Sequence, residues 1–298
     1  VYDVNFGADL TITEESQELI NRILKKNAPL PQITSCSPGW INYMEFFYSD
    51  LIPHVSTCKS PHEMQGAITK SYFAEKHNLK PEDIYVVSVM PCTAKKYEKE
   101  RPQNAAVNKL PDVDAVITTR ELAVMIKRAG MVWDELPEEK FDDDLLGEYT
   151  GAGAIFGVTG GVMEAALRTA YHTINGVEHD PIEFKAVRGL ENVKEAEVDM
   201  GKVGKVKVAV TSGMANAKPL LDQVRDGTSP YAFIEIMCCP GGCINGGGQP
   251  FVKPSLLPNE DPDILDTYRS KRANILYSID DKKSIRQSHN NPDIIRLY

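Results

Sequence analysis

The sequence lacks the two features that would take a chain into or across a membrane. Its 298 residues contain no apolar run of the roughly 18 residues that a spanning helix needs. No charged-then-apolar leader stands at its start, so nothing signals export. We therefore expect no membrane insertion and a cytoplasmic location.

The signatures of several common binding functions are also missing. Lys and Arg number 33 against 42 Asp and Glu, and the net charge of −9 argues against general nucleic-acid binding. The six histidines fall outside zinc-ligand motifs, and no thioredoxin-type Cys-x-x-Cys occurs. The glycine-rich residues 151–161 have neither the Lys-Ser/Thr of a phosphate-binding loop nor the spacing of a dinucleotide fingerprint. We interpret them as a loop of close backbone approach.

What the sequence does contain is ordinary globular composition, with 42% hydrophobic and 25% charged residues, enough for one large or two modest domains. Apolar, β-branched runs alternate with helical patterns, which predicts an α/β fold with a mainly parallel sheet. The run 84–90 is expected to be a buried central strand. An extended segment is expected at 1–10, followed by a helix that begins at Thr13. Further strands are expected at 182–188, 205–211 and 231–237, and further helices at 41–52, 62–76, 162–173 and 215–225. Residues 114–127 are expected to form a strand and then a helix whose N-cap is Thr119. Residues 101–111 and 133–150 are expected to be surface segments.

Five of the six cysteines lie in three loops, each beside Pro or Gly. The first loop is 34–40 (TSCSPGW), the second is 90–98 (MPCTAKKYE), and the third is 235–250 (EIMCCPGGCINGGGQP). The second and third loops directly follow predicted strands, and the carboxyl ends of parallel strands are where sites gather in α/β sheets. Thiolates from segments far apart in sequence suit an iron–sulfur cluster. The alternative is ordinary turns with buried thiols, which is our interpretation of the isolated Cys58.

The three loops resemble, in order and spacing, the three signatures of the [FeFe]-hydrogenase catalytic domain, and residues 151–167 are also similar to that family. The resemblance covers nearly the whole chain. It implies two lobes, each a mainly parallel sheet flanked by helices, with the cluster site between them. Within one domain of 1–298, the lobes are expected at 1–110 with part of the C-terminal tail, and at 111–250.

The cofactor that this resemblance implies is the H-cluster. It is a [4Fe–4S] cubane joined to a two-iron subcluster that carries CO, cyanide and a bridging azadithiolate. Cys92, Cys239 and Cys243 match cubane ligands, Cys243 being the bridging one, and Ser37 occupies the position of the fourth. Hydrogen and protons would be the substrates. The implied partners are maturation proteins and, as electron carrier, ferredoxin or an Fe–S/flavin subunit.

The resemblance also assigns roles around the cofactor. It implies a proton route through Cys36, Glu15, Ser56 and Glu18, with Arg22 at the exit, because each step needs a group that passes a proton over hydrogen-bond distance. Lys95 matches a lysine that hydrogen-bonds a cyanide, since a cation suits an anionic ligand. The remaining cofactor-binding positions are Met90, Pro91, Phe156, Met237, His62 and Gly241, of which His62 stands where the family often has Gln.

The chain departs from the family pattern at the first loop, where two adjacent cysteines are usual and Cys36 is followed by Ser37. A serine alkoxide is a poor iron ligand because its pKa is far above that of a thiol. Either Ser37 or a shifted Cys36 completes the ligand set, or the cubane is under-ligated. We favour the unshifted register because the loop has no insertion. Position 238, usually small and apolar, holds Cys238, which we expect to be tolerated there.

Three functions are therefore open. The first is an [FeFe]-hydrogenase catalytic core, a ferredoxin-type hydrogenase, with both ends of the family domain expected to be clipped. The second is a non-catalytic relative, an Fe–S assembly or sensory protein that keeps only the cubane. The third is a core fragment without cofactor. Lys95, Met90, Met237 and the acids of the proton route favour the enzyme.

Overall fold

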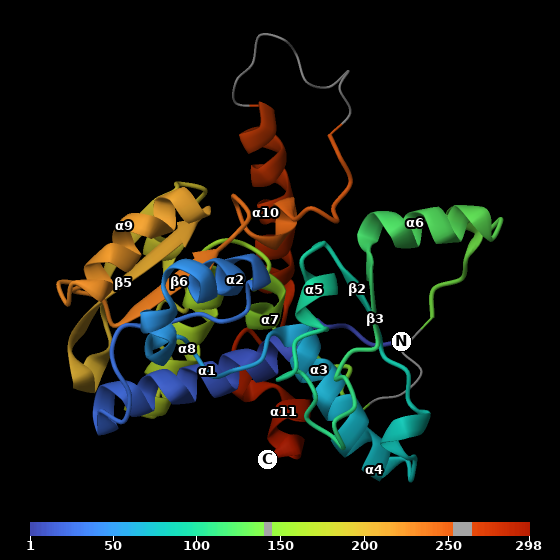
Figure 1. The fold of residues 1–298 in the computed structure, drawn as a ribbon, viewed down its shortest axis with the longest axis horizontal. Coiled ribbons are helices and arrows are strands. Elements are labelled where there is room, and N and C mark those ends of the chain that lie inside the picture. Colours follow the sequence, from blue (N-terminus) through green and yellow to red (C-terminus); the bar gives the residue numbers. More distant parts are fainter. Residues whose placement is uncertain (140–144, 253–263) are drawn as a thin grey trace.

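The computed structural model describes residues 1–139, 145–252 and 264–298. Its larger sheet has four strands in the order β1-β6-β5-β4 (Figure 1). The three strands β1 (Gln32–Ile33), β6 (Phe233–Met237) and β5 (Lys205–Ser212) are parallel. β4 (Val193–Asp199) pairs antiparallel with β5 at the edge. Five residues of β6 are buried, as expected of a strand covered on both faces.

The β5–α9–β6 segment is the predicted strand–helix–strand unit. Helix α9 (Met214–Arg225) connects β5 to the parallel β6, with Val208 opposite Phe233. Ala217 and Leu221 of α9 pack in one hydrophobic cluster with Ile234 of β6. This part of the sequence interpretation is confirmed, because an apolar strand run and an amphipathic helix leave few other arrangements.

The opposite face of the same sheet is covered by α8 (Gly161–Asn175) and α1 (Asn5–Lys25), which contribute to a second cluster with Phe233 and Val210. The extended segment expected at 1–10 is wrong, because α1 begins at Asn5 rather than at Thr13. Four apolar residues of its first turns are buried in two different hydrophobic clusters, Ala8 and Ile12 in one and Phe6 and Leu10 in the other. The apolar run is therefore that of a helix enclosed on more than one side.

The second sheet has only two described strands, β2 (Val87–Met90) and β3 (Ala115–Thr118), which are parallel. The prediction that 84–90 is a buried central strand is wrong. Val87 and Val89 are 50% and 40% exposed, since one face of this small sheet is open. Helix α6 (Thr119–Arg128) follows β3, and its cap is Thr118 rather than Thr119. The Thr118 hydroxyl accepts the Glu121 N–H, and the Glu121 carboxylate accepts the Thr118 N–H.

Two further expectations are corrected. Residues 182–188 form no strand but a 3₁₀ turn at Lys185–Val187, and the edge strand β4 was not predicted. Residues 151–161 begin with helix α7 (Gly151–Ile155) and are not all loop. The close backbone approach is real, because a Cβ on Gly153 would lie 2.7 Å from the Asn5 carbonyl oxygen of α1. Of the expected surface segment 133–150, residues 140–144 lie outside the described part.

Strand pairing does not follow the expected division at residue 110. β2 and β3 lie on either side of it in sequence and pair with each other, and β1 joins the sheet of β4, β5 and β6. The fold class itself is confirmed: parallel sheets are flanked by helices (Figure 1). The other helices are α2 (Pro38–Phe47), α3 (Pro61–Ile68), α4 (Ala74–Lys76), α5 (Lys95–Glu98), α10 (Ile264–Lys282) and α11 (Pro292–Leu297).

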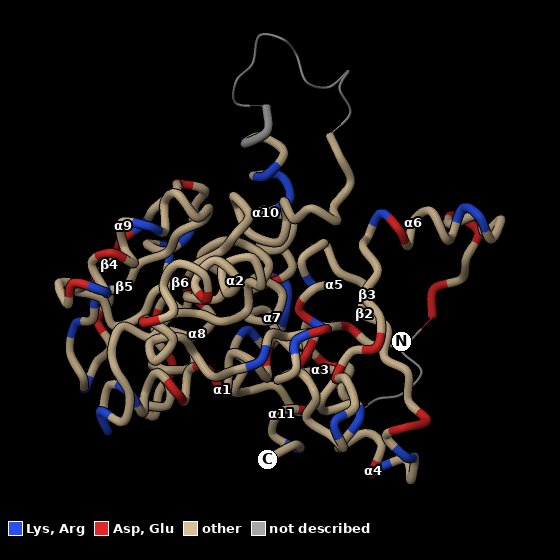
Figure 2. Tube along the Cα trace, viewed as in Figure 1, with Lys and Arg blue, Asp and Glu red and all other residues tan. Residues whose placement is uncertain are grey.

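Buried polar contacts connect the first helix to the last elements. The fully buried Asp9 carboxylate accepts hydrogen bonds from the Thr150 amide and hydroxyl, the Ser288 hydroxyl and the Asn291 amide. Figure 2 shows Lys and Arg interspersed with Asp and Glu along peripheral elements such as α6 and α9. Among the described helices, none combines the length and apolar character needed to cross a membrane.

Candidate metal centre

The three cysteine loops meet around one cavity of about 380 Å³. The loops follow β1, β2 and β6, so the cavity lies at the carboxyl ends of parallel strands, as the sequence predicted for the second and third loops. Helices α1 and α2 supply further wall. The cavity lining includes five cysteines and two residues with hydroxyl groups, which are Cys36, Cys92, Cys238, Cys239, Cys243, Ser37 and Thr93.

Glycines allow the second and third loops to touch. A Cβ on Gly246 would lie 2.1 Å from the Pro91 carbonyl oxygen, and one on Gly248 would lie 2.8 Å from the Pro91 carbonyl carbon. The Gly248 N–H donates to that same Pro91 oxygen at 2.9 Å. Gly242 has a φ of +91°, a conformation that favours glycine, and its N–H donates to the Cys239 carbonyl at 2.9 Å. Cys239 and Cys243 are thus presented on the two sides of a tight turn, facing Cys92.

The thiols of this cavity influence one another's ionisation. Burial, followed by the neighbouring Cys238 and Cys92, raises the pKa of Cys239 to about 11. Burial, followed by Cys92, raises the pKa of Cys243 to about 12. Thiolates this close in a buried site repel each other, and positively charged iron removes that repulsion. Soft sulfur donors from three segments therefore fit an iron–sulfur cluster.

The first loop contributes Cys36 and Ser37, whose surroundings and contacts differ. Cys36 is buried within the hydrophobic cluster beneath the sheet, and burial followed by Glu15 raises the pKa of its thiol well above the ordinary value. The Ser37 hydroxyl accepts the Cys238 backbone N–H at 3.1 Å. That hydrogen bond ties the first loop to the third loop beside the cavity.

Lys95 is held on α5 by two acceptors. Its ammonium donates to the Glu98 carboxylate at 2.6 Å and to the Cys36 carbonyl at 3.0 Å. Burial alone would lower the pKa of Lys95, but the adjacent Glu98 outweighs it and raises this pKa. The side chain is therefore a fixed, buried cation at the cavity wall. Sequence reasoning missed Glu98, because residues 90–98 were interpreted as a loop. In the helical turn α5 a residue three positions after Lys95 lies on the same face as Lys95.

His62 lines the cavity with both ring nitrogens engaged. One nitrogen lies 2.5 Å from the Glu98 carboxylate and the other lies 3.2 Å from the Ser88 hydroxyl. Burial, followed by the charge of Lys95, lowers the His62 pKa, so the ring is neutral at pH 7. Glu63, also missed, is buried beside His62, and burial followed by Glu98 raises its pKa to about 8.

The remaining wall is mostly apolar. Met90, Pro91, Phe156 and Met237 line the cavity, where the resemblance had placed them. Gly241 does not line the cavity. Its φ is +82°, and a Cβ added to it would lie 3.5 Å from Leu190 and from the side chain of Arg269, whereas the adjacent Gly242 lines the cavity. Sequence reasoning also missed three residues of the first helical turns, Val4, Asn5 and Ala8, because that segment was expected to be extended.

The residues of the expected proton route lie on or beside α1. The Ser56 hydroxyl donates to the Glu18 carboxylate at 3.0 Å, and Arg22 contacts Glu18 at 2.6 Å. Burial raises the pKa of the Glu15 carboxyl to about 8, and neither of its oxygens has a hydrogen-bond partner among the described residues.

Arg22 does not lie at an exit. It is buried, and its guanidinium also donates to the carbonyls of Pro29, Pro53, His54 and Val55. Glu18, with a side chain 17% exposed, is the member nearer to solvent. Cys58 is half-buried rather than buried, with its sulfur 3.9 Å from Glu18.

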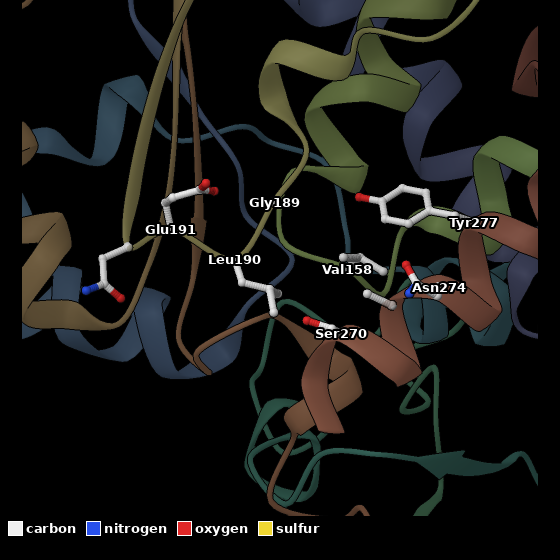
Figure 3. Close-up of a pocket in the computed structure, with 9 residues that line it drawn as sticks. Val158, Gly189, Leu190, Glu191, Ser270, Asn274 and Tyr277 are labelled. Atoms are coloured by element: carbon white, nitrogen blue, oxygen red, sulfur yellow. The ribbon is translucent and has the colours of Figure 1, made fainter. Parts of the chain in front are cut away.

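A larger cavity of about 570 Å³ holds no cysteine. Figure 3 shows it between the Gly189–Glu191 turn on one side and Ser270, Asn274 and Tyr277 of α10 on the other, with Val158 at its floor. Its lining offers no cluster of thiols or carboxylates, so the smaller, sulfur-rich cavity is the candidate metal centre.

Comparison with known proteins gives a consistent result for both parts of the chain. Residues 1–247 match the family described as iron only hydrogenase large subunit, C-terminal domain. Residues 256–298 match the family described as iron hydrogenase small subunit.

Similar curated proteins include the periplasmic [Fe] hydrogenase large subunit of Nitratidesulfovibrio vulgaris, 53% identical over 90% of this chain and 63% of that protein. Iron hydrogenase 1 of Clostridium pasteurianum is 46% identical over 100% of this chain and 50% of its own length. The chain thus spans about half to two-thirds of the length of these relatives. A cytosolic Fe-S cluster assembly factor of Xenopus tropicalis is 35% identical over 91% of this chain and 59% of its own.

Among solved structures, an apo variant of the [FeFe]-hydrogenase HydA1 from Chlamydomonas reinhardtii superposes with a TM-score of 0.80 at 41% identity. The alignment covers 100% of this chain and 79% of that one.

Proposed function

This chain belongs to the iron-only hydrogenase large subunit family, and from that membership we propose that it is the catalytic core of an [FeFe]-hydrogenase. The reaction is the reversible conversion of H2 into protons and electrons. The observation that carries the proposal is the convergence of Cys92, Cys239 and Cys243 on one cavity whose wall also holds the buried cation of Lys95. The relatives with 46% and 53% identity are named hydrogenases, which supports the same reaction.

The implied cofactor is the H-cluster, and the donor set of the cavity fits it. Cys92, Cys239 and Cys243 would hold the cubane, with Cys243 shared with the two-iron subcluster. When bound, that subcluster supplies an open iron site for heterolytic H2 cleavage and a bridging amine that takes the proton. Met90, Phe156 and Met237 supply apolar wall that excludes water from the cavity.

Lys95 is suited to hold an anionic ligand of the cofactor. An ammonium has three N–H donors, and two of them are used by Glu98 and the Cys36 carbonyl. The third is available on the cavity side, where a cyanide nitrogen would receive a charge-assisted hydrogen bond. Glu98 keeps the cation in place, because burial acts against ionisation of this carboxyl but Lys95 and His62 hold its pKa at about 2.

A proton can move away from the cavity along Cys36, Glu15, Ser56 and Glu18. Glu15 titrates close to neutral pH because its buried carboxyl has a pKa of about 8, which lets it both accept and release a proton. Within this route, the Ser56 hydroxyl donates a hydrogen bond of 3.0 Å to the Glu18 carboxylate. Arg22 is buried and contacts the Glu18 carboxylate, so we assign it the role of orienting Glu18 and not of carrying the proton.

For the electrons we propose a ferredoxin or an Fe–S/flavin subunit, because one relative with 47% identity is named an NADP-reducing hydrogenase subunit. Maturation proteins would supply the two-iron subcluster. The six free cysteines favour a reducing compartment and hence the cytoplasm, although one relative is named periplasmic.

The experiment is infrared spectroscopy of the protein after loading with iron, sulfide and a synthetic two-iron precursor. Sharp CO and cyanide bands together with H2 evolution from a reduced carrier are the expected result. A protein that binds four irons and four sulfides, but shows no such bands and no H2, would instead fit the assembly-factor relatives, which are 35% identical.

A further inference from the structure

We propose that Cys238 supplies the fourth thiolate of the cubane, in place of Ser37. This inference rests on the proposed function, since it concerns the ligands of that cluster. It changes the expectation that Cys238 is a tolerated small residue, and it assigns the missing sulfur to the third loop rather than the first.

The need for another sulfur follows from the donors already placed. Cys92, Cys239 and Cys243 give three thiolates, and a cubane needs four ligands. Ser37 lies at the cavity but offers an alkoxide, which iron–sulfur clusters bind poorly at neutral pH. Its hydroxyl oxygen also accepts the Cys238 backbone N–H at 3.1 Å.

That hydrogen bond places the two residues side by side across the junction of the loops. The Cys238 sulfur extends from this junction over the start of α2, where a Cβ added to Gly39 would lie only 2.7 Å from it. Gly39 is two residues after Ser37, so the sulfur occupies the region that a side chain on the first loop would otherwise reach. Cys238 lines the same cavity as the other three thiols.

Cys36 is the competing donor, because it also lines the cavity. It is buried in the hydrophobic cluster that contains Ala8 and Phe156, and its carbonyl accepts a hydrogen bond from the Lys95 ammonium. The proposed proton route begins at this thiol, which leaves Cys238 as the cysteine of the cavity without another role. Cys238 is half-buried. Two departures from the family pattern, Ser37 and Cys238, thereby compensate each other.

The bonding step is simple. As the cubane is assembled from two ferrous ions, two ferric ions and four sulfides, the Cys238 thiol loses its proton to solvent and its sulfur forms one bond to iron. No electron is transferred between Cys238 and the metal.

The test is reconstitution of the full chain with equal amounts of ferrous and ferric iron and with sulfide, without a two-iron precursor, followed by desalting. Iron and labile sulfide per chain, Mössbauer spectra and the EPR spectrum of the reduced protein are then measured. We expect C238A to lose the [4Fe–4S]⁺ signal and at least half of the iron, with a three-iron signal in the oxidised sample. We expect S37A and C36A to keep four irons.

The double variant S37C/C238A, which places sulfur on the first loop, should recover the four-iron cluster and so excludes misfolding as the cause of the loss. A C238A protein with four irons and an unchanged EPR spectrum would overturn the assignment, as would loss of the cluster in S37A. A wild-type protein that binds no cubane would overturn the proposed function as well.

Discussion

The ammonium of Lys95 and the carboxylate of Glu98 lie 2.6 Å apart, one turn from each other on α5 and both buried. His62 contacts the same carboxylate at 2.5 Å from the other side. A buried cation persists only with a partner of opposite charge, so the position of Lys95 at the cavity depends on Glu98. The carboxylate is thus a positioning residue for the cofactor wall.

We predict that Glu98→Gln destabilises the protein by about 3 kcal/mol, because it leaves the Lys95 charge buried without its partner. Urea denaturation of the protein without cofactor measures this. Glu100→Gln, whose side chain is 67% exposed, is the matched control and should change stability by less than about 0.5 kcal/mol. Equal effects of the two variants would contradict the role given to Glu98.

The pH dependence of the Glu98 contribution has a definite sign. Its folded-state pKa of about 2 is below the ordinary value of 4.5, so the contribution is complete above pH 4.5 and is lost as the pH falls toward 2. In Glu98→Gln the difference from wild type should therefore shrink over that range. Unfolding curves at several pH values test this.

We predict that Glu15→Gln lowers H2 evolution by about 100-fold or more, because it removes a group that accepts and releases a proton. The cubane content should stay unchanged, since Glu15 does not line the cavity. Glu14→Gln on the same helix is the control and should keep normal activity. A Glu15→Gln enzyme with full activity would rule out this route.

Glu15 also gives a stability signature opposite to that of Glu98. Its pKa is raised from 4.5 to about 8, so the folded state binds the extra proton and loses stability as the pH rises between these values. The slope from one such group is at most about 1.4 kcal/mol per pH unit. In Glu15→Gln the free energy of unfolding should fall less between pH 5 and pH 8 than it does in wild type, as measured by urea denaturation at several pH values.

We predict that Gly39→Ala reduces iron retention after reconstitution at least twofold. The added methyl would lie 2.7 Å from the Cys238 sulfur and must displace it. The same change should not weaken the fold of α2, since Ala favours helix over Gly by about 1 kcal/mol. In the C238A background, Gly39→Ala should have no further effect on iron content. An equal loss in both backgrounds would mean that the methyl disturbs something other than Cys238.

We predict that Asp280→Asn costs about 3–5 kcal/mol of stability. Asp280 on α10 is fully buried and pairs with Arg168 of α8 at 2.9 Å and with Arg286 at 2.6 Å. Asp281→Asn is the control, because Asp281 also contacts Arg286 but is 61% exposed. Thermal and urea unfolding compare the two variants. Similar small losses would show that the buried pair contributes little.

The sequence was sufficient to predict an element where its residue pattern is compatible with only one structure. The apolar run of β6, the amphipathic α9 and the parallel β5 follow from periodicity, and this unit places Cys239 and Cys243 at a strand end. The placement of the second and third cysteine loops directly after strands was likewise predictable. That these loops meet across two different sheets, and that the first loop follows β1, was not.

The sequence was not sufficient to predict the burial or conformation of a residue where these depend on contacts with residues far away in the chain. The exposure of Val87 and Val89 depends on whether another element covers that face of the β2–β3 sheet, which no local pattern contains. The first ten residues were mistaken for an extended segment because helix α1 is buried on several sides and shows no single polar face there. Gly241 lies outside the cavity lining and Arg22 is buried, because a resemblance assigns a residue to a site but does not give the direction of its backbone or side chain.

Asp9 imposes an order on biosynthesis. Its hydrogen-bond donors Ser288 and Asn291 lie 279 and 282 residues further along the chain. A ribosome that adds roughly 5–20 residues per second needs about 15 to 60 s to reach them. Until then the first helix, whose opening turns form one wall of the cavity, carries a carboxylate without its final partners. The hydrogen bonds that fix this wall are therefore complete only after residues 288–291 have been synthesised.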